Sequence, residues 1–178
     1  TLSISIVHKN SPVEQLNTLL DTIIGSIDPL AEHYSIALPP LYLVNNSDHI
    51  NLDLGNIRHK EAFERHLITL NDIQGHGNIG YGSAHNLTMR QLKSDFHLIL
   101  NPDIILEDDA LLRALEILIS DKGIVTLSPN AKSVLGNKLH LCKRYPSALI
   151  LLIRGFLPNK AKILFRAKLA RYEMRELE

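Results

Sequence analysis

The stretch Leu98-Ile99-Leu100-Asn101-Pro102-Asp103 decides how the fold of this chain is interpreted, because an apolar strand ends there in a short acidic turn. Pro102 fixes its own φ and pushes Asn101 towards an extended conformation, which holds the turn. Asp103 then stands at the end of the strand, where its carboxylate can bind a divalent cation that neutralises a diphosphate. An ordinary turn after a strand would explain the same residues. The neighbouring segments are therefore needed to distinguish a cation-binding turn from an ordinary one.

Length and composition predict a globular chain with one core, because 45% of the 178 residues are hydrophobic and 21% are charged. The single Cys142 excludes an internal disulfide framework and any site built from several cysteines, and it fits a reducing compartment. The longest apolar run, residues 148–153, is too short to span a bilayer, and no signal-peptide pattern is evident. We therefore expect a cytoplasmic protein.

Apolar runs alternate with helical periodicity along most of the chain. Strands are predicted at residues 2–7, 41–44, 67–70, 96–100 and 124–127. Helices are predicted from a capping box at Ser11 to an end near residues 25–29, from Ala84 to about Lys93 with Ser83 as the N-cap, and over residues 108–119. Residues 51–64 are polar and predict a loop followed by a short helix.

Strands that alternate with helices predict an α/β fold, with a mostly parallel, Rossmann-like sheet and helices on both of its faces. In such sheets, ligands bind at the carboxyl ends of the strands. Polar segments follow the predicted strands at residues 8–10, 45–47, 75–83 and 101–103. We therefore expect these four segments to meet at one edge of the sheet.

The third of these segments, Gly75-His76-Gly77-Asn78-Ile79-Gly80-Tyr81-Gly82-Ser83, contains four glycines. Glycine allows positive φ and lets backbone amides approach a ligand closely. A dinucleotide fingerprint fits poorly, because this loop does not follow the first strand and the sequence has no Gly-Lys-Ser/Thr phosphate loop. The nine histidines include neither an HExxH pattern nor a Cys/His pairing, so we do not expect a zinc site.

The order of four motifs along roughly the first 130 residues suggests a family. The motifs are Ser5-Ile6-Val7-His8-Lys9-Asn10, Val44-Asn45-Asn46-Ser47, Asn78-Ile79-Gly80-Tyr81-Gly82-Ser83-Ala84-His85-Asn86 and Leu100-Asn101-Pro102-Asp103. Taken together, they resemble the inverting glycosyltransferases of family 2, which have the GT-A fold, and within them the bacterial rhamnosyltransferase-like branch. The last motif corresponds to the metal-binding acidic motif of that family.

The resemblance implies transfer of a sugar from a nucleotide diphosphate donor, with Asp103 holding Mg²⁺ or Mn²⁺ against the diphosphate. It implies dTDP-rhamnose as the first donor to consider and a UDP-sugar as the second. The acceptor would be a glycan or a lipid-linked glycan in bacterial surface polysaccharide synthesis, and no nucleic-acid partner is expected. The residues implied to contact the donor are Asn10, Asn45, Ser47, Gly80, Tyr81, His85 and Asn101.

The sequence departs from the family pattern in two places. Asn45 stands where the family carries an Asp that contacts the nucleoside, although an amide can still donate and accept hydrogen bonds. We find no acidic residue matching the general base, which takes the proton from the acceptor hydroxyl in an inverting transfer. Two interpretations therefore stay open: a truncated enzyme, which we favour, or a catalytically silent nucleotide-binding or regulatory module.

We thus expect a nucleotide-sugar-binding GT-A core over residues 1–130 and a basic, partly helical extension over residues 131–178. Residues 1–125 hold 8 Lys or Arg and 16 Asp or Glu, whereas residues 126–178 hold 11 Lys or Arg and 3 Asp or Glu. The first part is therefore acidic and the second basic. Residues 160–178 resemble a basic amphipathic helix in outline. Such a helix could contact an anionic membrane at the inner face of the plasma membrane, pack on its own domain, or pair with a second copy in a homodimer.

Overall fold

The computed structural model of the chain describes residues 1–34, 40–48, 69–157 and 163–175. The chain divides into two compact units, Thr1–Ile119 and Ser120–Glu178. The boundary predicted from the sequence falls later, after residue 130. The short helix predicted within residues 51–64 lies outside the described residues, as do the first residues of the strand predicted at 67–70.

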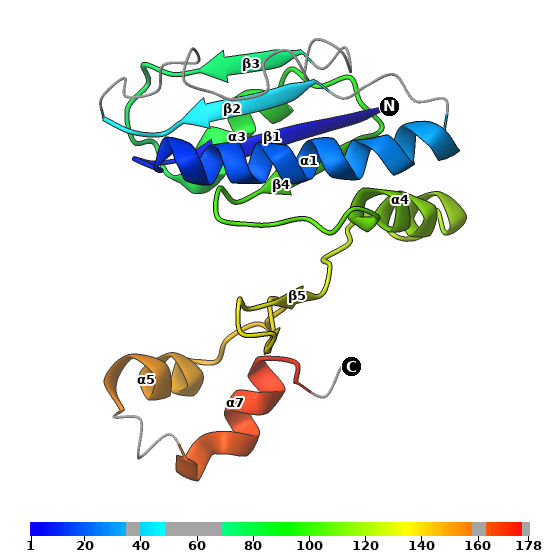
Figure 1. The fold of residues 1–178 in the computed structure, drawn as a ribbon. Helices are drawn as coiled ribbons and strands as arrows, with labels where there is room; N and C mark the ends of the chain where they lie inside the picture. Colours follow the sequence, from blue (N-terminus) through cyan, green and yellow to red (C-terminus); the bar gives the residue numbers. More distant parts are fainter. Residues whose placement is uncertain (35–39, 49–68, 158–162, 176–178) are drawn as a thin grey trace. The chain divides into compact units, whose positions relative to one another are not determined.

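A parallel sheet with the strand order β3-β2-β1-β4 forms the centre of the first unit (Figure 1). Its strands are β1 (Leu2–His8), β2 (Leu41–Asn45), β3 (Leu70–Ile73) and β4 (Phe96–Leu100). Every pairing is parallel, and Ile6 lies opposite Leu43 on one side and Leu100 on the other. The strands therefore end at one common edge, and the predicted parallel α/β sheet is confirmed.

Helices cover both faces of this sheet, as predicted, with α1 and α3 on opposite sides in Figure 1. One buried cluster joins Leu2, Ile4 and Ile6 of β1 to α1 (Val13–His33) and α4 (Ala110–Ser120). Alternate residues of β1 point to the other face, where Val7 packs with Ala84 of α3 (Tyr81–Met89). β1 is buried on both faces, because α1 and α4 pack against one side of it and α3 against the other.

Helix α1 differs from its prediction at both ends. The expected capping box is absent, because the N-cap is Pro12 and no side chain caps the helix. The helix also continues through Pro29 to His33, so the predicted end at residues 25–29 is wrong. The reason is tertiary packing: the later turns bury Ile27 and Leu30 in the core, which outweighs the local cost of a proline inside the helix.

Gly25 marks a close approach between segments rather than a helix end. A Cβ atom at this position would lie 3.3 Å from Asp108 Oδ1. Beside it, Ser26 Oγ donates a hydrogen bond to the carbonyl oxygen of Glu107 at 2.9 Å. The segment leading from β4 to α4 is therefore fastened to α1, and this segment begins with the turn at residues 101–103.

Two of the predicted strands also differ from what the structure shows. The third strand, β3, covers Leu70–Ile73, so it overlaps the predicted range 67–70 only at Leu70 among the described residues. Residues 124–127 form no strand, and Val125 is 91% exposed. A short apolar run carries too little periodicity to predict whether a partner strand will be available, and no strand in the described part of the chain pairs with this one.

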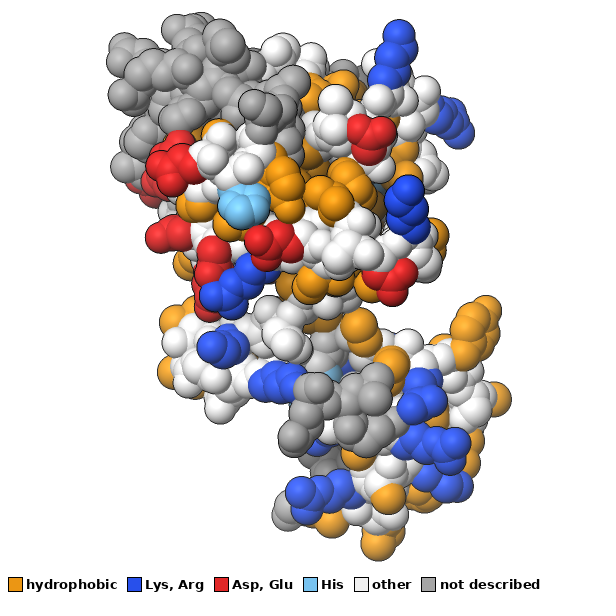
Figure 2. All heavy atoms as spheres, turned by 90° about the vertical axis from the view of Figure 1, so that its right-hand side faces the viewer, with side chains coloured by type: hydrophobic (Ala, Val, Ile, Leu, Met, Phe, Trp, Pro, Cys, Tyr) orange, Lys and Arg blue, Asp and Glu red, His pale blue; other side chains and the backbone are white. Residues whose placement is uncertain are grey.

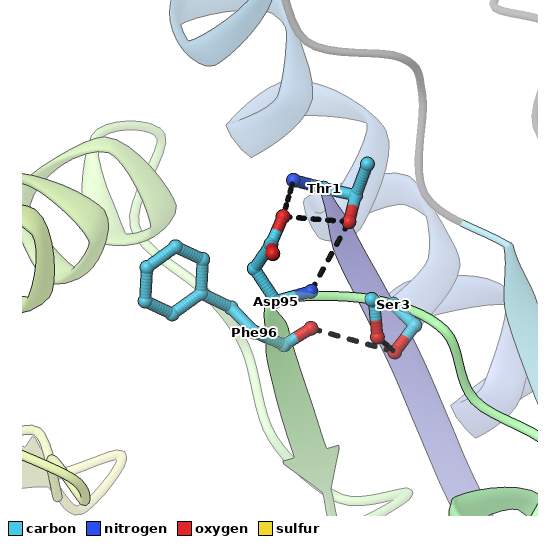
Figure 3. Close-up of polar contacts among 5 residues, drawn as sticks. Thr1, Ser3, Asp95 and Phe96 are labelled. Carbon is cyan, nitrogen blue, oxygen red and sulfur yellow. Dashed lines mark hydrogen bonds and ion pairs between the residues drawn. The ribbon is translucent and has the colours of Figure 1, made fainter.

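Side-chain contacts join the amino ends of β1 and β4, at the far edge of the sheet from the polar turns (Figure 3). Thr1 Oγ1 donates to Asp95 Oδ2 at 2.8 Å, and the backbone N–H of Asp95 donates back to Thr1 Oγ1 at 3.1 Å. These contacts fix the start of the strand pair whose other end carries residues 101–103.

The second unit contains a short hairpin and two packed helices. The elements are β5 (Ala131–Lys132), β6 (Lys138–Leu139), α5 (Ala148–Phe156), the 3₁₀ turn η2 (Ile163–Phe165) and α7 (Arg166–Tyr172). Arg154 of α5 donates from Nη1 to the hydroxyl of Tyr172 at 2.9 Å, and its guanidinium lies 5.3 Å from the ring centre. None of the helices in the described residues combines the length and apolarity needed to cross a membrane.

Candidate functional site

The ends of β1 and β2 are tied together at the carboxyl edge of the sheet. The backbone N–H of Asn10 donates to Ser47 Oγ at 2.8 Å, and that of Asn46 donates to the carbonyl oxygen of His8 at 2.8 Å. Asn10 adopts a positive φ of 52°, a conformation that Asn tolerates better than most residues. The structure therefore brings together Asn10 and Ser47, two of the residues predicted to line a nucleoside.

Asn45 is buried, and its side chain stabilises the same turn. Its Oδ1 accepts a hydrogen bond from the backbone N–H of Ser47 at 3.1 Å, as in an Asx turn. A carboxylate in this place would accept the same bond, so Asn45 provides the same local structure without a charge. The predicted donor contact of Asn45 stays a prediction.

The glycine loop is held against the end of β2 by Asn46, which is buried. Its Nδ2 donates to Asn78 Oδ1 at 3.1 Å, and its Oδ1 accepts from the backbone N–H of Ile79 at 3.0 Å. Asn78 Oδ1 in turn accepts from the backbone N–H of Gly80 at 3.2 Å. Asn46 and Asn78 were not among the predicted site residues. The signals available in the sequence were the Asn-Asn pair after a strand and an Asn among the glycines of the loop.

Gly80 is the residue on which the loop turns into α3. It is the N-cap of the helix with a φ of 86°, in the region that glycine reaches without strain. The carbonyl oxygen of Gly80 accepts the N–H of Ala84 at 3.0 Å. The prediction that Ser83 caps this helix is wrong, because positive φ lets the chain enter the helix earlier than a side-chain cap would.

Tyr81, the first residue of α3, reaches the end of β4. Its hydroxyl donates to Asn101 Oδ1 at 2.7 Å, so two predicted site residues are in direct contact. Partial burial raises the pKa of Tyr81, and the negative charge of Asp103 raises it further. The phenol is therefore protonated at neutral pH and remains a hydrogen-bond donor, with the Asp103 carboxylate nearby.

His85 lies beneath Tyr81 rather than at the surface. The two rings form an edge-to-face contact with centroids 4.5 Å apart, and His85 is only 3% exposed. Its Nδ1 shares a hydrogen bond of 2.8 Å with Ser5 Oγ, which also contacts His97 Nε2 at 2.8 Å. Burial lowers the pKa of His85 to about 4, with His97 as a second cause. His85 therefore supports Tyr81 from beneath, and its predicted donor contact stays a prediction.

A second buried histidine, His8, is the last residue of β1. His8 is buried at the end of the strand, and among the described residues neither ring nitrogen has a hydrogen-bond partner. Burial lowers the pKa of His8, so the ring is neutral at neutral pH. His8 belongs to the first motif but is not one of the predicted site residues. Its burial could not be predicted, because histidine is a polar residue that is found both buried and exposed.

Asp103 is the only carboxylate in the turn after β4, and it is exposed. Within the described residues, no group of three His, Cys, Asp or Glu side chains could hold a metal ion by itself. Mg²⁺ is commonly bound by one or two carboxylates together with the phosphates of a substrate. The residues present therefore fit a cation that shares its ligands with a bound diphosphate, and they do not form a protein-only metal cage.

No family model matches the sequence, and no curated protein sequence matches it. The structure is similar to mannosyltransferase PcManGT from Pyrobaculum calidifontis, solved in complex with GDP-Man and Mn²⁺, with a TM-score of 0.51 and 16% identity over 66% of this chain and 32% of that chain. S. aureus TarS gives a TM-score of 0.48 and 17% identity over 67% of this chain and 19% of that chain. The structure of residues 1–349 of S. aureus TarS in complex with UDP gives a TM-score of 0.46 and 17% identity, over 66% of this chain and 32% of that chain.

The similarity to PcManGT confirms the GT-A type of α/β fold that the motifs predict. At 16% identity this similarity concerns the fold alone. The chain spans between 19% and 32% of the length of these solved structures, all of which are longer. The family 2 assignment and the rhamnosyltransferase branch stay predictions.

Proposed function

We propose that this chain forms the donor-binding part of a glycosyltransferase that uses a nucleotide diphosphate sugar. The observation that carries the proposal is the convergence of all four predicted motifs on the carboxyl edge of a GT-A sheet. The motifs are joined there by the Asn10–Ser47, Asn46–Asn78 and Tyr81–Asn101 hydrogen bonds. A fold-level rule places ligands at this edge, and the residues found there can recognise a nucleoside and a diphosphate.

In this proposal, Asn10, Asn45 and Ser47 lie along the nucleoside, and the loop ending at Gly80 and Tyr81 lies beside the diphosphate. Asp103, with Asn101 before it, faces the divalent cation. A cation bound there would neutralise the charge that develops on the departing diphosphate. The complex of PcManGT with GDP-Man and Mn²⁺ supports both a nucleotide sugar and a divalent cation for a protein of this fold.

The finer parts of the proposal rest on the sequence motifs. On that basis, we propose an inverting transfer of the family 2 type. The first donor to test is dTDP-rhamnose, and the second is a UDP-sugar. The acceptor is a glycan or lipid-linked glycan of a bacterial surface polysaccharide, and the reaction takes place in the cytoplasm. The residue that removes the proton from the acceptor hydroxyl is not assigned.

The test is calorimetric titration of the chain with dTDP, UDP and GDP, each with and without Mn²⁺. We expect one nucleotide to bind, and its affinity to rise with Mn²⁺. Asp103→Ala should remove the effect of Mn²⁺, whereas Glu107→Ala, which removes an exposed carboxylate shortly after the same turn, should keep it. A folded chain that binds none of the three nucleotides would contradict the proposal, as would a Mn²⁺ effect that survives in Asp103→Ala.

A further inference from the structure

Helix α5 of the second unit has an apolar face that nothing in the described residues covers. Leu149, Leu152 and Phe156 recur at i, i+3 and i+7 and therefore share one side of the helix. Leu152 is 53% exposed and Phe156 is 86% exposed. Another side of the helix packs within the unit, because Ile150 and Ile153 are buried there. The exposed stripe is thus additional to the face that stabilises the unit.

The turn η2 adds further exposed apolar side chains to the same unit. Ile163 is 71% exposed and Leu164 is 83% exposed, and both directly precede the basic helix α7. Leu149, Leu152 and Phe156 lie together along one side of α5, and contiguous exposed apolar surface of this kind marks an interaction site. We call the set Leu149, Leu152, Phe156, Ile163 and Leu164 the apolar patch.

Positive charge accompanies the apolar patch. The described residues between 126 and 175 hold nine Lys or Arg, namely Lys132, Lys138, Lys143, Arg144, Arg154, Arg166, Lys168, Arg171 and Arg175. The acidic residue in the same stretch is Glu173, which forms an ion pair with Arg175. Figure 2 shows Lys and Arg side chains beside exposed hydrophobic ones over this unit. The surface therefore combines apolar side chains with an excess of positive charge.

We propose that the apolar patch and the basic side chains of α7 dock this unit on an anionic lipid membrane, as a peripheral contact. Exposed Leu and Phe side chains can enter the boundary between headgroups and acyl chains, while Lys and Arg attract anionic headgroups. A second copy that docked through the same unit would bring the same positive charge to the contact, which opposes such symmetric pairing. A nucleic acid would use the charge but would leave the aliphatic stripe uncovered.

The experiment is sedimentation of the full chain with vesicles of phosphatidylcholine alone, and with vesicles of phosphatidylcholine and phosphatidylglycerol in equal parts. We expect binding to the anionic vesicles only, weakening as salt is added. The double variant Leu152→Gln with Phe156→Gln should weaken binding about tenfold or more. Val134→Gln, which removes a fully exposed apolar side chain from the turn between β5 and β6, is the matched control and should bind as the parent chain does.

The charge contribution has its own pair of variants. Arg166→Gln and Lys168→Gln should each weaken binding about fivefold, since one basic side chain near an anionic surface contributes about that much. Lys93→Gln removes one charge from the first unit and should have no effect. Circular dichroism shows whether each variant is folded, and all of the exchanged side chains are exposed.

Three results would overturn the proposal. The first is equal binding to both kinds of vesicle, or none. The second is self-association of the parent chain that the double variant abolishes, which would assign the patch to a second copy. The third is binding to a DNA duplex that exceeds vesicle binding and is indifferent to Leu152 and Phe156. None of these measurements involves a nucleotide sugar, so their failure is separate from a failure of the proposed function.

Discussion

The hydroxyl of Tyr81, at the start of α3, donates a hydrogen bond to Asn101 Oδ1, at the end of β4, over 2.7 Å. This bond joins the glycine loop directly to the acidic turn. Asp103 lies near enough for its charge to contribute to the raised pKa of Tyr81. In the proposed site, the loop beside the donor and the carboxylate that faces the cation are therefore positioned by one another.

Replacing Tyr81 by Phe should weaken the cation-dependent part of nucleotide binding. The ring and its contact with His85 remain, but the turn at residues 101–103 loses a bond of about 0.5–1.5 kcal/mol, which corresponds to a loss of affinity of about two- to twelvefold. We expect this loss in calorimetric titrations that contain Mn²⁺ and a smaller one in those without. Tyr145→Phe, at a fully exposed ring, is the control. Equal losses with and without Mn²⁺ would contradict a role in positioning Asp103.

Replacing Asn46 by Ala should destabilise the first unit and release the glycine loop. The buried amide makes two hydrogen bonds to the loop, and its removal leaves Asn78 Oδ1 and the Ile79 N–H without that partner. We expect the free energy of unfolding in urea to fall by about 1–3 kcal/mol. Asn86→Ala, at an exposed position of α3, should change it little. An unchanged stability in Asn46→Ala would mean that the loop is held by other contacts.

Much of the fold follows from local pattern. The strand predicted at residues 96–100 matches β4 in both bounds, and those at 2–7 and 41–44 match β1 and β2 apart from one residue. In each case a buried apolar run is bounded by residues that form turns. The predictions fail where burial overrides local signals, as at Pro29 within α1, or where an apolar run has no partner strand, as at residues 124–127.

The candidate site was predictable in position but not in its contacts. The rule that ligands bind at the carboxyl ends of parallel strands is enough to bring Asn10, Ser47, Tyr81 and Asn101 to one edge. Which polar residue faces inward is decided by the face of the strand or helix on which it falls, so Asn46 and His85 became internal supports. A single sequence does not reveal these pairings, because they join residues that are 33 and 80 positions apart along the chain.

Gly80→Ala tests the conformation that starts α3. At a φ of 86° an alanine is strained although no atom lies within 4 Å of its Cβ, so we expect a loss of about 1–2 kcal/mol in the free energy of unfolding. Gly82→Ala is the matched control, since Gly82 is within the first turn, has open space and needs no positive φ. It should raise stability by up to about 1 kcal/mol through helix propensity. Equal effects of the two changes would contradict this account.

Stability should fall as the pH falls, because His85 is buried in its neutral form. In the unfolded chain its pKa is near the ordinary value of 6.5, whereas burial, with His97 as a second cause, lowers it to about 4 in the folded protein. Above pH 6.5 the ring is neutral in both states. As the pH falls from 6.5 to about 4, the unfolded chain takes up a proton that the folded protein does not, so the free energy of unfolding decreases.

For His85 this loss should amount to about 1–3 kcal/mol, and His8 and His97, whose pKa values burial also lowers, should add to it. Urea unfolding measured at a series of pH values across this range gives the slope. His85→Gln, in which the amide can still bond to Ser5, should flatten the slope. A slope that is the same in His85→Gln as in the parent chain would show that His85 is not the group taking up the proton on unfolding.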